Sequence, residues 1–186
     1  MDLVLILLPP ILMILDYSLT MKSANMVKGK YSEHFSVEQF ELNPVWQEDV
    51  SKAKKFNIKH LIMVLIAAGL AYSVVKLSIF DEWSSYFVLG IIIIPYATIV
   101  GRHISNILTF KYVENYSDTL HGKLIVDYIY TLKLSQHMLI GNIFVLSIIY
   151  ICTFSSFILG GILGYFSLYV SHSMWKGKYK KKKKDN

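Results

Sequence analysis

Long apolar runs are the feature that most constrains how this chain folds. Residues 3–21, 58–79 and 86–108 each approach the length of a helix that crosses a lipid bilayer, about 20 residues. A fourth apolar run, residues 134–175, is about twice that length. Only 17% of the residues are charged, whereas soluble domains have about 25%. The sequence therefore predicts an all-α transmembrane helical bundle that forms a single membrane domain over residues 1–186.

The fourth apolar run decides the number of spans. One straight helix over it would be about 60 Å long, twice the hydrocarbon core of a bilayer. Two helices joined by a turn at residues 153–156 fit better, which makes five spans with the N-terminus outside. This count places the basic segments 22–55, 102–133 and 176–184 together in the cytosol, as the positive-inside rule expects. Four spans remain the alternative, and they would put one basic segment outside.

Two polar segments are expected on the cytosolic side. Residues 22–57 form a loop, in which Asn43 and Pro44 have the order of a helix cap and first helical residue. We therefore expect an amphipathic surface helix between the first two spans. Residues 176–186 form a basic tail that contacts anionic lipid head groups. Because lysines beside apolar runs account for the net charge of +6, this charge does not indicate nucleic-acid binding.

A few polar side chains within the spans are the candidate functional residues. Asp16 is the most informative of them, since an unpaired carboxylate in a membrane costs about 2.5–3.5 kcal/mol on insertion scales. Arg102 falls at a similar depth on the third span, so an Asp16–Arg102 pair is one hypothesis. Snorkelling of both side chains to the head groups is the alternative. The candidates are Asp16, Thr20, Arg102, His103 and Asn106.

Small residues recur at helical spacing on the last span. Gly160, Gly164, Ser167 and Ser171 form a stripe along which another helix can approach closely. This stripe predicts packing within the bundle. A homo-oligomer interface is the second interpretation, and a different membrane-protein partner is also left open.

Motifs for catalysis are weak. Glu38 and Glu41 in the first loop, together with histidines at the cytosolic ends of spans, suggest a metal-dependent hydrolase only as a third hypothesis, because the paired histidines of zinc proteases are missing. The sequence predicts no catalytic residue, no metal ligand and no cofactor, and it leans against an enzyme. The single cysteine, Cys152, lies in an apolar run and is expected to be a packing residue.

One pattern resembles a known group of proteins. Asp16 with Thr20 four residues later, followed by Glu41-Leu42-Asn43-Pro44, is similar to a pattern in small uncharacterised multi-span membrane proteins of prokaryotes. The matching segment covers about a quarter of the chain. The resemblance implies a multi-span membrane fold and no particular activity.

The functional hypotheses follow from these features. The first is a non-enzymatic accessory or assembly component of a membrane. The second is a small transporter or channel that uses Asp16 and Arg102. The C-terminus is expected in the cytosol, and the protein is expected in the cell membrane if its source is a prokaryote. The dilysine pattern at residues 183–186 would instead favour the endoplasmic reticulum in a eukaryote.

Overall fold

The computed structural model describes residues 2–52, 54, 56–77 and 80–185. Almost all of the regular structure in these residues is helical, with one short pair of strands. The elements are α1 (Asp2–Met26), α2 (Tyr31–His34), β1 (Phe35–Val37), α3 (Gln47–Ser51), α4 (Ile58–Lys76), α5 (Glu82–Asn115), η1 (Ser117–Thr119), β2 (Leu124–Val126), α6 (Tyr128–Thr153) and α7 (Ser156–Asp185).

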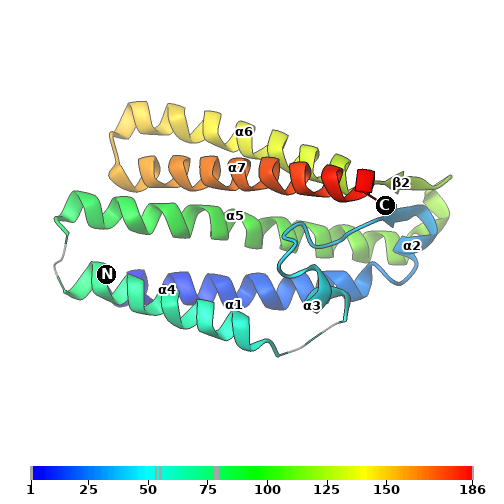
Figure 1. The fold of residues 1–186 in the computed structure, drawn as a ribbon, viewed down its shortest axis with the longest axis horizontal. Coiled ribbons are helices and arrows are strands. Elements are labelled where there is room, and N and C mark those ends of the chain that lie inside the picture. The colour runs from blue at the N-terminus through cyan, green and yellow to red at the C-terminus, as the bar shows by residue number, and fades with distance from the viewer. Residues whose placement is uncertain (1, 53, 55, 78–79, 186) are drawn as a thin grey trace.

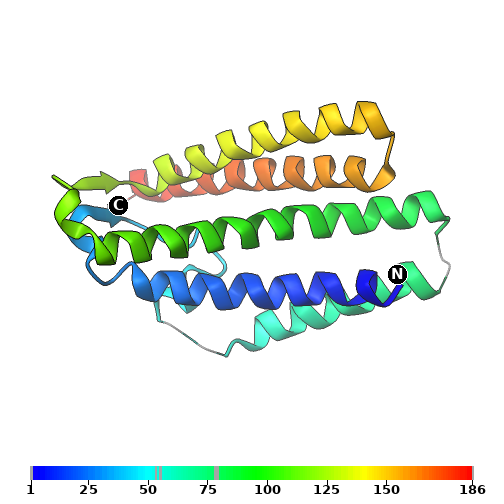
Figure 2. The same cartoon turned by 180° about the vertical axis from the view of Figure 1, so that it is seen from behind.

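Five of these helices, α1, α4, α5, α6 and α7, are long and apolar enough to cross a membrane. They pack in a row in the order α4, α1, α5, α7 and α6 (Figures 1 and 2). The two ends of the row differ. At the end that we call the turn end lie the start of α1, the end of α4, the start of α5 and the α6–α7 turn. At the opposite end, the loop end, lie residues 27–52, residues 116–127 and the end of α7.

The α1, α4 and α5 helices share one apolar core. Leu12 of α1, Ala71 and Val74 of α4, and Leu89 and Ile93 of α5 are buried together there. By contrast, many large apolar side chains on the outer faces are exposed, such as Leu65 on α4 and Phe144 on α6. An apolar outer surface of this kind is what lipid tails cover in a membrane bundle. The exposed residues therefore agree with the membrane fold that the sequence predicts.

Glycines set the distance between α5 and α7. A Cβ atom added to Gly160 would lie 2.0 Å from the carbonyl oxygen of Phe87. A Cβ atom added to Gly90 would likewise lie 2.0 Å from the carbonyl oxygen of Phe157. Gly164 is packed against Ile91 in the same way. The two helix backbones are thus in direct contact, which only residues without a side chain allow.

The loop end is closed by the segments between the spans. Strand β1 pairs in parallel with β2, with Phe35 opposite Leu124 and Val37 opposite Val126. The loop that follows β1 packs on α1, where Phe40, Trp46 and Val50 surround Met21 and Ala24. The pairing of β1 with β2 connects the loop between α1 and α4 to the loop between α5 and α6, although nearly ninety residues separate the two strands in the sequence.

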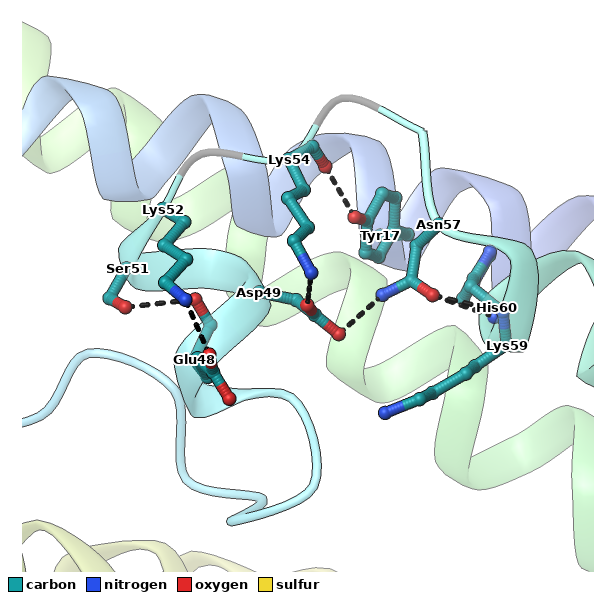
Figure 3. A network of polar contacts seen from close by, with 9 residues as sticks. All are labelled: Tyr17, Glu48, Asp49, Ser51, Lys52, Lys54, Asn57, Lys59 and His60. Carbon is teal, nitrogen blue, oxygen red and sulfur yellow. Dashed lines mark hydrogen bonds and ion pairs between the residues drawn. The ribbon is translucent and has the colours of Figure 1, made fainter.

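A polar network fixes the start of α4 (Figure 3). Asn57 caps the helix, because its side-chain oxygen accepts hydrogen bonds from the backbone of Lys59 and His60. Its amide nitrogen donates to Asp49 at 2.7 Å, and Lys54 donates to the same carboxylate at 2.6 Å. The Lys54 hydrogen bond, with a further one from Asn57, lowers the pKa of Asp49 despite its burial. The network therefore connects α3, the chain after it and α4.

The structure confirms five spans and corrects several details. The last apolar run forms two helices, and the turn lies where it was predicted, with Phe154 in the left-handed region at φ 49°. The predicted surface helix is only the five-residue α3. The Asn43 side chain accepts a hydrogen bond from the backbone nitrogen of Val45 and begins a turn. Helix α3 starts four residues after Asn43. Helix α1 continues through Pro9 and Pro10 without interruption.

Candidate functional site

Two side chains of α1 meet one histidine of α5 inside the bundle. Asp16 and Thr20 are one helical turn apart and therefore share a face of α1. The Asp16 Oδ1 atom lies 3.0 Å from His103 Nε2, and the Thr20 hydroxyl also lies 3.0 Å from this nitrogen. Thr20 is 4% exposed and His103 is 8% exposed. Asp16 is thus held by polar partners within a helix pair that is otherwise apolar.

The geometry at His103 limits its chemistry. Both partners bind Nε2, while Nδ1 is buried and has no hydrogen-bond partner among the described residues. A serine–histidine–aspartate triad places the nucleophile and the carboxylate on opposite ring nitrogens. Here Thr20 and Asp16 share one nitrogen, so Thr20 is not arranged as an activated nucleophile. The arrangement instead orients the ring and leaves one nitrogen open to a proton or a cation.

Arg102 lies next to His103 in the sequence and connects this group to α6. Its guanidinium donates to the Ser135 hydroxyl at 3.1 Å. It lies close enough to Asp16 and Glu41 to interact with both charges. The hypothesis of a direct Asp16–Arg102 pair is therefore replaced, because His103 occupies the ion-pair position at Asp16.

Glu41 reaches the same group from the loop after β1. Its carboxylate accepts a hydrogen bond from the backbone nitrogen of Asn43 at 2.7 Å. Burial raises the pKa of Glu41 to about 7, with a smaller contribution of the same sign from Asp16. The Asn43 hydrogen bond and the charges of His103 and Arg102 act in the opposite direction. We call Asp16, Glu41, Arg102 and His103 the charged cluster.

The loop that carries Glu41 is tied to α6. The Tyr128 hydroxyl donates to the carbonyl oxygen of Leu42 at 2.6 Å, and its backbone nitrogen donates to Glu38 at 3.0 Å. The Gln47 side chain donates to the carbonyl oxygen of Glu41 at 3.1 Å. Tyr128 is buried, with 1% of its surface exposed. These bonds hold the loop backbone on both sides of Glu41, whose carboxyl group interacts with charges on α1 and α5.

A second polar group lies between α6 and α7 at the loop end. Gln136 of α6 donates to Ser173 at 2.7 Å and to the carbonyl oxygen of Tyr169 at 3.3 Å. Lys176 donates to the Gln136 side-chain oxygen at 3.4 Å. His172 is buried beside Arg102, and its Nδ1 has no partner among the described residues. This group borders the charged cluster through Arg102 and anchors α6 on α7.

The remaining predicted residues divide between the interior and the surface. Asn106 is partly buried on α5 and makes no side-chain hydrogen bond to the described part of the chain. Gly160 and Gly164 pack on α5, whereas Ser167 is exposed and Ser171 only partly buried, each bonding to its own helix. The packing face of α7 continues instead through the buried Tyr165 and His172. Beyond the two glycines the stripe thus turns away from α5.

The sequence named Glu41 in connection with a metal site and in the pattern of the resemblance, and it missed Ser135 altogether. Glu38 binds Tyr128 and Tyr179, so the two loop glutamates do not converge. No group of three His, Cys, Asp or Glu side chains in the described residues is arranged to hold a metal ion. No local signal would have placed Glu41 beside Asp16, because loop docking depends on contacts with α6.

Two grooves lie at the turn end, far from the charged cluster along the helices. The larger, of about 900 Å³, is lined mainly by apolar side chains, among them Trp83, Tyr86 and Phe157. The smaller, of about 360 Å³, includes Asp2, Glu82 and Ser85. Both grooves are formed where helix ends separate, and neither includes a residue of the charged cluster.

Comparisons of the chain with family models, with curated proteins and with solved structures find no match. The functional argument therefore depends on the geometry of the charged cluster.

Proposed function

We propose that the protein is an integral membrane protein with the loop end in the cytosol. The support is the distribution of charge over the two ends of the bundle. Among the described residues, Lys76 is the one basic residue at the turn end, where Asp2, Asp81 and Glu82 also lie. The other described lysines lie in the loop-end segments or in the parts of the helices that lead to them. Positively charged segments stay in the cytosol during insertion, so this distribution favours an external N-terminus and a cytosolic C-terminus.

We further propose that the protein is a small cation carrier whose binding site is the charged cluster. The observation that carries this proposal is the gathering of Asp16, Arg102, His103 and Glu41 inside a bundle of apolar helices. Ionisable side chains within membrane spans are rare and mark ion or substrate pathways.

The charge balance of the cluster favours a cation. With both carboxylates ionised and Arg102 charged, the cluster has one excess negative charge whenever the His103 ring is neutral. A buried net charge is costly, so binding of one monovalent cation or proton would stabilise the cluster. The Asp16 carboxylate and the Nδ1 atom of His103, which is buried without a partner among the described residues, are the groups that would bind a metal cation.

Cation transport is testable with purified protein reconstituted into vesicles on a solid-supported membrane. We expect jumps in Na⁺, K⁺ or proton concentration to produce transient currents with at least one of these cations. The Asp16→Asn substitution should reduce that current by about tenfold or more, because a charged hydrogen bond contributes about 1.5–3 kcal/mol. Asp118→Asn is the matched control, since Asp118 is an exposed aspartate in η1, and should leave the current unchanged.

Two outcomes would contradict the carrier. One is the absence of current with all three cations from folded wild-type protein. The other is a wild-type current from the Asp16→Asn variant.

We also propose that the lysine-rich end of α7 contacts anionic lipid. This helix continues to Asp185 and includes residues 180–184, all lysines. Each lysine near an anionic surface contributes about 1 kcal/mol of attraction. Replacing these five lysines with glutamine should weaken enrichment of phosphatidylserine around the protein in nanodiscs, whereas unchanged enrichment would exclude the contact.

A second candidate function is an accessory or assembly component. The observation that favours it is the single row of helices, in which α4 and α6 are at the two edges. Gly69 of α4 and Gly141 of α6 face outward, and no atom lies within 4 Å of a Cβ added to either. Small residues of this kind permit close approach of another transmembrane helix. Isolation in mild detergent after crosslinking would test it, and a chain recovered alone would count against a partner.

A further inference from the structure

Glu41 differs from the rest of the charged cluster because it comes from a loop. Asp16, Arg102 and His103 lie on long helices, whereas Glu41 is in the segment 38–47 between β1 and α3. The side chain of this loop residue is partly buried, and one oxygen accepts a hydrogen bond from the backbone nitrogen of Asn43. A change at Glu41 is therefore able to move a loop without moving a span.

The groups that face Glu41 come from each element around it. Asp16 on α1 repels the ionised carboxylate, and Arg102 and His103 on α5 attract it. Tyr128 on α6 is also close to it, and that side chain holds the next residue of the loop through its hydroxyl group. The groups around Glu41 are thus the carboxylate of Asp16, the guanidinium of Arg102, the imidazole of His103 and the neutral phenol of Tyr128.

We propose that Glu41 is a proton-binding site and that loss of its proton releases residues 38–47 from the bundle. Its part in transport rests on the proposed carrier function, whereas proton binding and loop release do not depend on it. Protonated, Glu41 leaves Asp16 and Arg102 to balance each other in the interior. Ionised, it adds the excess negative charge of the cluster, and moving into water removes that charge from the bundle.

The direction of the pH dependence follows from the two environments of the carboxyl group. In the docked loop the pKa is raised from 4.5 to about 7, and in a released loop it returns to its ordinary value. The docked state is therefore favoured fully below the released pKa and loses this contribution as the pH rises through the docked pKa. Between these limits the ratio of docked to released loop falls by about 300-fold.

The attachments of the loop allow such a release. The segment 38–47 is held by hydrogen bonds from Tyr128 and Tyr179 and by the packing of Phe40 and Trp46 against Met21 and Ala24 of α1. No long helix is interrupted when these contacts open. Local opening of one short loop requires much less free energy than unfolding of the bundle. Release would bring the loop end of the cluster into contact with water.

Hydrogen–deuterium exchange of the full chain in nanodiscs tests the proposal. After correction for chemical exchange, protection of backbone amides in residues 38–47 should fall by about 70-fold between about pH 5 and about pH 8 in the wild type. Glu41→Gln should remove this pH dependence, because glutamine stays neutral. Glu33→Gln is the matched control and should behave as the wild type, since Glu33 is exposed on α2.

The proposal is overturned if wild-type protection in this segment does not change with pH, or if Glu41→Gln keeps the wild-type profile. If Glu41→Gln does not fold, the wild-type profile still decides, together with infrared detection of a carboxylic acid that titrates near pH 7. Neither measurement involves transport. Failure of the loop release, seen by hydrogen exchange, is thus distinguished from failure of the carrier function, seen by the transport current.

Discussion

The ring of His103 decides how Asp16 is held in the bundle. One nitrogen contacts both Asp16 and Thr20, and the other is buried without a partner among the described residues. The sequence identified these residues as unusual from their type and position, since each is polar within an apolar run. It did not predict that Asp16 would contact His103 instead of Arg102. Both residues lie at nearly the same depth on α5, and only the rotation of α5 relative to α1 distinguishes them.

A substitution at His103 should reveal how strongly it stabilises Asp16. We expect His103→Ala to lower the free energy of unfolding by about 1.5–3 kcal/mol, because a carboxylate loses its main hydrogen-bond partner. His121→Ala is the control and should change the free energy by less than about 0.5 kcal/mol, since His121 is exposed. Reversible unfolding in mixed micelles would measure both. Equal stability of the two variants would mean that water replaces His103 at Asp16.

At the scale of elements, close approach and capping determine which helices lie together. The α5–α7 interface needs glycine at positions where the backbones touch, and the start of α4 needs Asn57. The sequence predicted the role of Gly160 and Gly164 from their spacing. It could not predict that Gly90 completes the same contact on α5, because nothing in its neighbourhood identifies the partner helix.

Substitution of Gly160 by alanine tests the α5–α7 contact. The added methyl group would lie 2.0 Å from a carbonyl oxygen, so the helices must separate. We expect a loss of stability of about 1–3 kcal/mol, as for overpacking in protein cores. Gly141→Ala is the matched control, because its methyl group meets nothing within 4 Å. A steric-trapping or denaturant titration that ranks the two variants equally would exclude direct backbone contact at Gly160.

Asn57 has two roles that different substitutions separate. Asn57→Ala removes both the helix cap and the bond to Asp49, and should lower stability by about 1 kcal/mol. Asn57→Asp keeps the cap but places two carboxylates together, so it should be destabilising at neutral pH and improve as these groups are protonated. The ion pair of Asp49 with Lys54 acts in the opposite sense. The pKa of Asp49 is lowered in the folded protein, so the stabilisation by its ion pair with Lys54 is lost as the pH falls through that pKa.

The measurement for Asn57 is thermal unfolding in detergent across the acid range. The stability of Asn57→Asp should rise relative to that of Asn57→Ala as the pH falls and the carboxylates are protonated. Parallel curves would show that Asp49 and residue 57 do not interact in solution.

At the scale of the whole molecule, the row of helices separates two chemically different ends. The loop end is basic and carries the tied loops, whereas the turn end carries Asp2, Asp81 and Glu82. The charged cluster lies toward the basic end, beneath the loop that contributes Glu41. This arrangement predicts that the two ends lie on opposite sides of the membrane.

Single cysteines test the orientation directly. In a Cys152→Ser background, Thr153→Cys marks the turn end and Thr119→Cys marks the loop end; both positions are exposed. An impermeant maleimide added to intact cells should label the turn end, and label the loop end only in inverted vesicles. Labelling of both from one side would require an even number of spans between them and contradict the five-span topology.

The sequence by itself favoured five spans over four, and it determined their approximate limits and the difference in charge between the two ends. These properties depend on the transfer of each segment from water to lipid and on the charge beside it, which are local quantities. Only the tertiary structure decided that His103 and not Arg102 contacts Asp16, that α5 and α7 touch at their glycines, and that Glu41 enters the bundle. Each of these contacts depends on the rotation and register of one element against another. A helix formed by an apolar run of nearly uniform hydrophobicity has no face that is much more apolar than the others. Packing against the neighbouring helices therefore decides which face is buried.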